Sequence, residues 1–325
     1  MNDRQKAMTF SYPEYIPVSI GVLPAGWLKH GDALKDIAGK YPGIISIPEE
    51  SNYRDLVQGG YAEGERVDEW GCVWTNIFEG HAGMVTGHPV PTRADVHKLK
   101  MPEKDGGLPH GFMFQRLADL RGFEEIMIDF AEEPPELQML IDIVLEYNLQ
   151  QAPKLFEIFK DNKPDPLWFG DDLGMQLSLP ISPEKWRKYL KPCYAKIYKM
   201  ARDAGFNVYM HTDGHIVEII PDLIECGVKV VNPQIRANGL DNLVAACKGK
   251  VCVDLDLDRQ LFPFCTPEDI DDHVREAVEK LGSPKGGLWI HAEVDDGVPL
   301  VNIEALCIAM QKYKRAFPKT KNRDR

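Results

Sequence analysis

Short apolar runs alternate with longer stretches of helical periodicity from about residue 107 onward. This alternation is typical of consecutive βα units, in which helices cover a parallel sheet. Two earlier apolar runs, Ile16–Val22 and Ile44–Ile47, are candidates for additional strands. The later runs predict six strands, at Phe112–Gln115, Leu167–Gly170, Asn207–His211, Val228–Asn232, Val251–Leu257 and Gly287–Glu293. Together these strands would close a (β/α)8 barrel, or TIM barrel, which is the α/β fold that we predict.

The helices between these strands have recognisable ends. One begins at the Pro134–Pro135 pair and is predicted to run to about residue 160. A second begins after Ser182, which supplies an N-cap oxygen before a proline, and is predicted to continue to Ala204. Thr266–Asp269 repeats this start signal. The glycines expected just after helix ends are Gly205, Gly227 and Gly282.

No internal repeat or low-complexity linker divides the chain, so we predict a single domain over residues 1–325. Residues 107–318 carry the clear βα units, whereas residues 1–106 form an elaborated N-terminal portion. Within that portion, Tyr53–Pro91 is rich in glycine, tryptophan and acids and is expected to form loops or a hairpin over the barrel mouth. Residues 319–325 form a short basic tail, which we expect to be frayed.

Charge and composition argue against several classes of function. The formal net charge is −12 and no long run of Lys or Arg is present, whereas nucleic-acid binding needs a basic face. The sequence lacks the roughly 18 consecutive apolar residues of a membrane span. Its start lacks the apolar stretch of a signal peptide, so we expect a cytoplasmic protein. The seven cysteines include no C-x-x-C pair and are expected to be reduced thiols.

Acids and histidines gather where the predicted strands end. Alternate residues of a strand face the same side, so His211 shares a face with Asp213, and His291 shares a face with Glu293. Any one such acid is commonly a helix cap or turn former, and a lone histidine is commonly structural. In a barrel, however, the carboxyl ends of all strands surround one pocket, and the accumulation predicts an active site there. The other acids at these ends are Asp171, Asp172, Asp254, Asp256, Asp258 and Asp295.

His211 and Asp213 form a His-x-Asp pair. With a carboxylate from another strand, this pair would provide three ligands for Zn²⁺ and leave a fourth position open for substrate. The same groups would also serve as a proton relay without any metal. The residue types alone leave both alternatives open.

Several stretches resemble the uroporphyrinogen decarboxylase superfamily, and more closely its corrinoid-dependent methyltransferase branch. The similarity covers most of the chain after residue 66 and implies a (β/α)8 barrel. The stretches that carry it are D-E-W-G-C-V-W (68–74), L-R-G-F-E-E-I-M-I-D (120–129), G-D-D-L-G-M-Q (170–176), I-S-P-E-K-W-R-K-Y-L-K-P (181–192), H-T-D-G-H (211–215), I-I-P-D-L-I-E-C-G-V (219–228), N-P-Q (232–234) and L-F-P-F-C-T-P-E-D (261–269).

The resemblance implies a metal centre with a changed ligand set. Methyltransferases of this branch typically hold zinc with H-x-C and a later cysteine. Carried over, His211 remains a ligand and Asp213 stands at the first cysteine position. Glu293 is the best candidate for the third ligand, and His291 is the second candidate. Because a carboxylate donates less charge than a thiolate, this centre would be harder and suited to oxygen ligands.

The resemblance and the ligand types together imply methyl transfer rather than decarboxylation of a porphyrinogen. The decarboxylases bind carboxylates through an arginine-rich N-terminal loop, whereas Ile16–His30 contains no arginine. We expect a methyl group to pass from an O-methyl substrate, such as a methoxylated aromatic, to the Co(I) of a corrinoid protein, with zinc polarising the ether oxygen. The corrinoid protein is expected to be a separate partner, because the sequence has no D-x-H-x-x-G cobalamin motif. We expect it to dock at the barrel mouth, which the Tyr53–Pro91 region would frame.

The expected catalytic residues are Asp171 and Asp172, which would position substrate hydroxyls or water, and His215, which would shuttle a proton. An aromatic pocket is expected around Trp70, Trp74 and Phe78, although packing of an N-terminal cap explains these residues equally well. The residues expected to contact substrate are Trp70, Trp74, Glu79, His81, Asn232, Gln234 and Asp256.

Two other functions remain open at this stage. One is a metal-independent decarboxylase that acts on a smaller acid, and the other is a non-catalytic barrel that binds a ligand. The sequence does not fix the methyl donor, the direction of transfer, the metal, the partner or the oligomeric state, a homodimer included.

Overall fold

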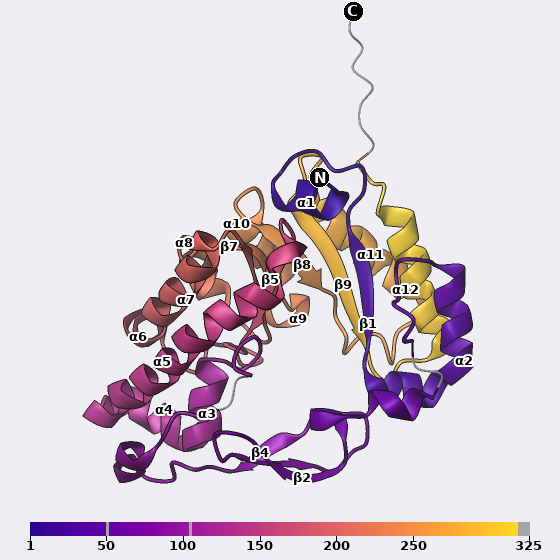
Figure 1. Ribbon diagram of the computed structural model, residues 1–325. Coiled ribbons are helices and arrows are strands. Elements are labelled where there is room, and N and C mark those ends of the chain that lie inside the picture. The colour runs from indigo at the N-terminus through magenta and orange to yellow at the C-terminus, as the bar shows by residue number, and fades with distance from the viewer. Residues whose placement is uncertain (50–51, 104–105, 318–325) are drawn as a thin grey trace, which may run out of the picture. The chain divides into compact units, whose positions relative to one another are not determined.

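The computed structural model describes residues 1–49, 52–103 and 106–317, so the predicted basic tail at residues 319–325 lies outside the described residues. The chain forms two compact units. Unit 1 comprises the described residues of Met1–Ala62, Phe78–Ala82 and Gln234–Arg325, and unit 2 those of Glu63–Ile77 and Gly83–Pro233. Each unit combines parallel strands with helices (Figure 1). The single domain over residues 1–325 stays a prediction.

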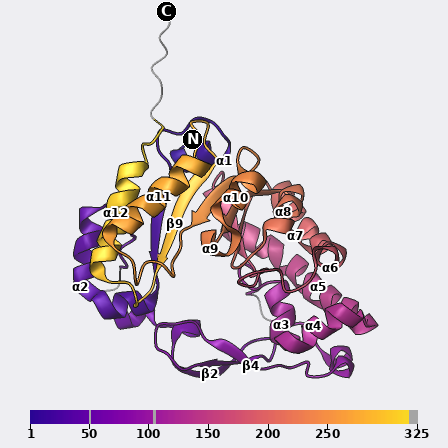
Figure 2. The ribbon, with the colours of Figure 1, turned by 180° about the vertical axis from the view of Figure 1, so that it is seen from behind.

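Unit 1 contains the parallel strands β1 (Val18–Val22), β8 (Cys252–Asp256) and β9 (Leu288–Val294). Strand β9 lies in the middle, and its residue His291 is opposite Ser19 of β1 and Asp256 of β8. Helices α2, α11 and α12 lie along one side of β1 and β9 (Figure 1), and the view from behind shows α11 and α12 next to each other (Figure 2). The helices of unit 1 are α1 (Asp3–Met8), α2 (Pro24–Lys40), η1 (Tyr53–Leu56), η2 (Gly59–Tyr61), α9 (Ile235–Asn238), α10 (Leu240–Cys247), α11 (Pro267–Leu281) and α12 (Leu300–Tyr313).

Unit 2 contains the parallel strands β5 (Pro166–Gly170), β6 (Asn207–Thr212) and β7 (Val228–Pro233), with β6 in the middle. A separate antiparallel sheet is formed by β2 (Gly64–Val67), β3 (Val73–Asn76) and β4 (Met84–Gly87), so the hairpin expected within Tyr53–Pro91 is present. The helices of unit 2 are η3 (Arg93–Lys98), α3 (Phe114–Arg121), α4 (Phe123–Glu132), α5 (Pro135–Ile158), η4 (Lys160–Asn162), α6 (Pro183–Tyr189), α7 (Lys191–Asp203), η5 (Val217–Ile219) and α8 (Ile220–Glu225).

The α/β class is confirmed, and the observed parallel strands agree with six of the eight predicted ones. The strand predicted at Phe112–Gln115 is wrong, because the backbone N–H groups of residues 113–115 all donate to the Asp171 carboxylate and start helix α3 there. The strand predicted at Ile44–Ile47 is reduced to a one-residue bridge between Ile45 and Ile20. Closure into an eight-stranded barrel stays a prediction.

Local signals set most helix ends. The Ser182 side chain accepts a hydrogen bond from the Lys185 N–H, and Thr266 forms a capping box with Asp269, as predicted. The helix predicted from Ser182 to Ala204 is instead two helices, α6 and α7, which meet at Leu190. Pro192 accounts for the break, since its ring has no N–H to donate and is suited to the first turn of a new helix.

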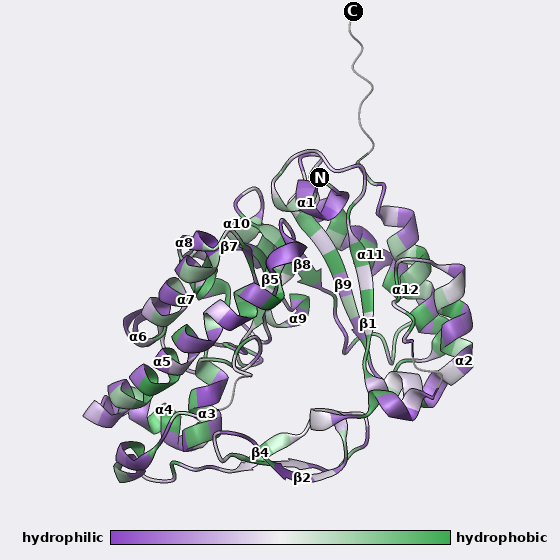
Figure 3. Ribbon diagram, viewed as in Figure 1, coloured by the Kyte–Doolittle hydropathy of each residue, from purple (hydrophilic) through white to green (hydrophobic). Residues whose placement is uncertain are grey.

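The pattern of buried residues differs between helices and strands. The helices of both units carry separate polar and apolar faces (Figure 3), whereas every residue of β8 is buried, including Asp254 and Asp256. All seven cysteines are free. None of the helices within the described ranges combines the length and the hydropathy that are needed to span a bilayer.

Candidate functional site

The predicted site residues divide between the two units. Unit 2 carries Trp70, Trp74, Asp171, Asp172, His211, Asp213, His215 and Asn232. Unit 1 carries Glu79, His81, Gln234, Asp256, His291 and Glu293. Within unit 2, parallel register places Gly170 opposite His211 and His211 opposite Asn232. The ends of β5, β6 and β7 therefore bring four of the predicted side chains together, namely Asp172, His211, Asp213 and Asn232.

His211 has a fixed orientation near the end of β6. Its Nδ1–H donates a hydrogen bond of 2.6 Å to the side-chain oxygen of Asn232. Nδ1 is thus engaged with Asn232, and Nε2 is the ring nitrogen that faces away from this bond, toward the neighbouring acids. Nε2 lies 3.5 Å from a carboxylate oxygen of Asp213 and 3.8 Å from one of Asp172. This is the arrangement of a metal-ligating histidine with an outer-shell partner.

A second histidine, His110, completes a cluster with Asp172 and His211. Its Nε2 lies 3.6 Å from Oδ1 of Asp172, and a one-residue parallel bridge joins His110 to Gly170 at the end of β5. One donor atom from each of His110, Asp172 and His211 lies within 4.8 Å of the other two. Two imidazole nitrogens and a carboxylate oxygen fit a zinc ion, with one coordination position left for substrate or water.

Trp168 of β5 holds the two imidazoles of this cluster. Its ring is stacked on His110 and on His211, with centroid separations of 5.8 Å and interplanar angles of 18° and 20°. Gly170 makes room for this arrangement. A Cβ atom at Gly170 would lie 2.4 Å from Cδ2 of His110 and 2.7 Å from the Trp168 ring, so any larger residue would clash with both rings.

The neighbouring acids Asp171 and Asp172 have different surroundings. Asp171 is fully buried and accepts hydrogen bonds from the N–H groups of residues 113–115 and from the hydroxyl of Tyr194, at 2.6 Å. Asp172 is partly exposed, and its Oδ2 accepts a bond of 2.9 Å from the side-chain amide of Gln115. Asp171 thus fixes the start of α3, while Asp172 belongs to the cluster. Their catalytic roles stay predictions.

The cluster residues shift each other's pKa values. Burial lowers the pKa of His110, but the Asp172 carboxylate and the charges of Asp171 and Asp213 outweigh this effect, so the net pKa is raised. Burial raises the pKa of Asp172, but His110, the Asp213 N–H and His211 outweigh it, so the net pKa is lowered. Carboxylate and imidazole therefore favour charge on each other.

A cavity of about 450 Å³ lies beside His110 in unit 2. Its volume is in the range of small-molecule sites. Asp68 organises one wall, since its carboxylate accepts bonds from Arg116, at 2.7 Å, and from the indole N–H of Trp74, at 3.1 Å. The cavity is lined by Arg66, Asp68, Glu69, Trp74, Gly83, Met84, Val85, His110, Gly111, Gln115, Arg116 and Asp119. Trp74, a predicted substrate contact, thus shares a cavity with His110.

Asp119 is an unusual acid on the wall of this cavity. Burial raises the pKa of its carboxyl to about 6; Arg116 opposes this shift, and the negative charges of Asp68 and Asp171 add to it. The Arg116 guanidinium lies 3.8 Å from it. We therefore expect Asp119 to change protonation near pH 6 rather than in the usual range of an aspartate.

The remaining predicted residues of unit 2 have structural contacts. The Nε2 atom of His215 lies 2.9 Å from a carboxylate oxygen of Glu218. Trp70 is buried and meets the ring of Tyr147 edge-on, with a centroid separation of 5.0 Å. Their predicted roles as proton shuttle and substrate contact have no direct support from these contacts.

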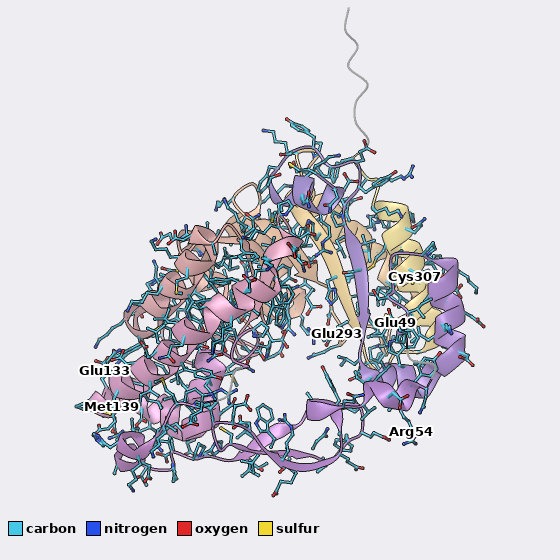
Figure 4. The ribbon with its side chains drawn as sticks, in the orientation of Figure 1. Glu49, Arg54, Glu133, Met139, Glu293 and Cys307 are labelled. Atoms are coloured by element: carbon cyan, nitrogen blue, oxygen red, sulfur yellow. The ribbon has the colours of Figure 1, made fainter. Side chains whose placement is uncertain are left out.

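In unit 1, the predicted ligand Glu293 on β9 (labelled in Figure 4) forms an ion pair with Arg259. The same guanidinium pairs with Asp256. His291, the second candidate, has its Nδ1 atom 3.1 Å from the Ser19 hydroxyl. The ligand roles of Glu293 and His291 stay predictions.

The other residues of unit 1 that were predicted to contact substrate lie in two segments, at residues 79–81 and at the bridge between residues 234 and 256. Glu79 forms an ion pair with Arg54, at 3.0 Å, and the His81 ring lies 3.5 Å from Asp295 and 3.8 Å from Asp296. Gln234 forms a one-residue parallel bridge with Asp256. Their roles in substrate binding stay predictions.

Sequence reasoning missed His110 and Trp168. His110 lies outside every predicted strand, in a Pro-His-Gly segment, so the pattern of acids and histidines at predicted strand ends does not include it. Trp168 lies within the predicted strand Leu167–Gly170, where an aromatic residue is expected as core, yet it is 39% exposed. The available signal for Trp168 was its position two residues before Gly170, at the carboxyl end of the strand.

Comparisons with solved structures give only weak likenesses. A dihydropteroate synthase of Xanthomonas albilineans is 12% identical, with 44% of this chain and 52% of that chain covered and a TM-score of 0.30. The chain thus spans about half the length of that structure. The Yersinia pestis DHPS is 13% identical, with 50% and 89% covered and a TM-score of 0.30. A chitinase from Chromobacterium violaceum is 9% identical, with 84% and 67% covered and a TM-score of 0.26.

These TM-scores are too low to carry an argument about fold or activity. No curated protein matches the chain. The family model described as uroporphyrinogen decarboxylase (URO-D) matches residues 114–313, which is more than half of the 325 residues. That range includes Asp172, Trp168 and His211, whereas His110 precedes it. The chain belongs to the uroporphyrinogen decarboxylase family.

Proposed function

We propose that the protein is an enzyme that moves a methyl group from an O-methyl substrate, such as a methoxylated aromatic, to the Co(I) of a separate corrinoid protein. The observation that carries the proposal is the placement of His211, whose Nδ1–H is held by Asn232 while Nε2 faces the carboxylates of Asp172 and Asp213. Such a nitrogen and oxygen donor set, without a thiolate, is suited to a metal ion that acts on oxygen.

Zinc held there would polarise the ether oxygen and stabilise negative charge that develops on it. In the proposed transfer the C–O bond would break with its electron pair staying on that oxygen, while the methyl carbon would bond to the cobalt of the partner, which would formally change from Co(I) to Co(III). The leaving oxygen would take up a proton from solvent. No oxidant other than the methyl donor would be needed, so the corrinoid and one proton would be the co-reactants.

The protein's own groups would bind and orient the methyl donor. The cavity beside His110 offers the indole of Trp74 and the side chains of Met84 and Val85 to an apolar ring. Asp68 keeps the Trp74 indole in place through its N–H, and the Arg66 guanidinium lies over the same ring, 4.7 Å from its centroid. These contacts favour a flat substrate whose ether end is directed toward His110.

The test is methylation of a Co(I) corrinoid by the purified protein, followed through the loss of the Co(I) absorption. Methoxybenzenes, thioethers and methylamines are compared as donors at equal concentration. We expect methylation from methyl ethers that depends on the protein and on zinc. Methylation from thioethers or methylamines alone would overturn the oxygen-substrate proposal. Release of CO2 from a carboxylic acid by metal-free protein would favour the decarboxylase alternative.

A further inference from the structure

We propose that the zinc ligands of this chain are His110, Asp172 and His211, rather than the His211, Asp213 and Glu293 set that the family pattern implies. The proposal deepens the proposed function by naming the ligands of its metal centre. It rests on that function only for the choice of zinc over other divalent ions. The site lies wholly within unit 2, on the ends of β5 and β6 and the segment before α3.

The distances in the cluster fit shared coordination better than hydrogen bonding. Nε2 of His110 and Nε2 of His211 lie 3.6 Å and 3.8 Å from the same oxygen, Oδ1 of Asp172. Such separations exceed those of a hydrogen bond. Ligand atoms about 2.1 Å from a tetrahedral zinc ion are roughly 3.4 Å from one another. The two His–Asp172 separations therefore exceed the spacing of zinc ligands by only a few tenths of an ångström, and the two imidazole nitrogens lie within 4.8 Å of each other.

The orientation of His211 also fits a cation site. With Nδ1 held by Asn232, Nε2 is directed toward the carboxylate oxygens of Asp172 and Asp213. Two carboxylates that face the same nitrogen repel each other, and a cation bound among these groups would offset the repulsion.

Asp172 and His211 have hydrogen-bonded outer contacts, and both histidines have a stacking contact, as is typical of metal ligands. Asn232 orients His211. Asp172 is held through both oxygens, since Oδ2 accepts from the Gln115 amide at 2.9 Å and Oδ1 accepts from the backbone N–H of Asp213 at 3.0 Å. His110 and His211 are both stacked on Trp168. The bond from Asp213 gives that residue a backbone role in the centre.

Asp213 and Glu293, which the family pattern implies as ligands, are less suited to that role. Asp213 lies 3.5 Å from His211, but it is not a member of the group whose donor atoms all lie within 4.8 Å of one another. The Glu293 carboxylate is already neutralised by Arg259. Using Glu293 as a ligand would place the metal ion in competition with that guanidinium. His110 has no such competitor in the described contacts apart from Asp172 itself.

The test measures zinc binding alone, without corrinoid or methyl donor. Metal-free protein is titrated with Zn²⁺ in the presence of a chromophoric chelator, and bound metal is counted by elemental analysis. We expect one zinc per chain in the wild type. His110→Gln, Asp172→Asn and His211→Gln should each weaken zinc binding by more than about 100-fold, beyond the loss expected from an outer-shell change. Asp213→Asn and Glu293→Gln should stay within about 10-fold of the wild type.

His97→Gln is the matched control, because His97 is a half-exposed histidine of unit 2 outside the cluster, and it should bind zinc as the wild type does. Co²⁺ substitution adds a spectroscopic readout, since d–d bands should weaken in His110→Gln but not in Asp213→Asn. Circular dichroism melting curves identify variants that fail to fold.

Two outcomes would overturn the proposal. One is wild-type zinc affinity in His110→Gln together with loss in Glu293→Gln or Asp213→Asn, and the other is no zinc bound by the wild type. Stoichiometric zinc with the expected variant pattern, but no methylation of a Co(I) corrinoid from any donor, would retain the site and reject the proposed function. The two failures are therefore distinguishable.

Discussion

The Nδ1 atom of His211 and the Oδ1 atom of Asn232 lie 2.6 Å apart, on residues that are register partners of the neighbouring strands β6 and β7. Because this contact follows from strand pairing, the sheet itself sets the orientation of the histidine. Sites supported by strands are more rigid than sites on loops, and a preorganised ligand binds its metal more tightly.

Replacing Asn232 by leucine removes the acceptor that holds His211 but leaves every proposed ligand in place. We expect Asn232→Leu to weaken zinc binding by roughly 10–100-fold without changing the number of ions bound. Asn232→Asp keeps an acceptor and should recover most of the affinity. Chelator competition measures both variants. Wild-type affinity in Asn232→Leu would show that the contact does not orient the ligand.

Gly170→Ala should disturb the cluster through sterics alone. The added methyl group would lie 2.4 Å from His110 and 2.7 Å from Trp168, so both rings or the Gly170 backbone must move. We expect at least a 10-fold loss of zinc affinity and a cost of about 1–3 kcal/mol in the free energy of unfolding. Gly39→Ala is the control, because nothing lies within 4 Å of its new Cβ in helix α2. Equal effects of the two substitutions would contradict this prediction.

Substitutions of Asp171 and Asp172 should have different effects, the first on the free energy of unfolding and the second on zinc binding. Asp171→Asn places an amide NH2 group among four donors and should lower the free energy of unfolding by about 1–3 kcal/mol. Asp172→Asn should change the stability of the metal-free protein much less. Urea denaturation of metal-free samples gives both values. If Asp172→Asn were the more destabilising change, the assignment of the two roles would be reversed.

Asp119 should make stability depend on pH. Burial raises the pKa of Asp119 from its ordinary value of 3.8 to about 6 in the folded protein, so the folded state binds the proton more tightly than the unfolded state. This tighter binding adds to the free energy of unfolding. The contribution is complete below pH 3.8 and is lost as the pH rises through 6. It amounts to at most about 3 kcal/mol, at 1.36 kcal/mol per unit of pKa.

Asp119→Asn tests this linkage, because asparagine cannot titrate. Urea unfolding of wild type and variant between pH 4 and pH 7 should show a steeper fall with rising pH in the wild type. Asp95→Asn is a suitable comparison, since hydrogen bonding to Lys98 and Thr92 lowers the pKa of Asp95 to about 2, below the range tested. Parallel curves for wild type and Asp119→Asn would rule out the raised pKa.

The strands and helix caps were predictable because their signals are local. Parallel strands such as Pro166–Gly170 appear in the sequence as short apolar runs. Ser182 and Thr266 begin helices because their side-chain oxygens accept hydrogen bonds from backbone N–H groups three residues further along. The error at Phe112–Gln115 is of a different kind. Its helical start is set by the Asp171 carboxylate, which lies more than fifty residues further along the chain.

The candidate site was predictable only in part for the same reason. His211 and Asp172 stand at the ends of predicted strands, where barrel chemistry is expected, and the structure brings them together. His110 reaches them through a bridge to Gly170, which is a tertiary contact with no local sequence signal. The spacing in the sequence therefore favoured Asp213, two residues from His211, over a histidine that is a hundred residues away.

The contrast between Asp171 and Asp172 has an evolutionary consequence. A relative that kept this architecture but lost its metal would still need the first aspartate, because helix α3 begins on its oxygens. Asp172 would then be under no such constraint and could be replaced by other residues. Among relatives of this kind, the residue that follows the counterpart of Asp171 would indicate whether the metal site is retained, before any assay is performed.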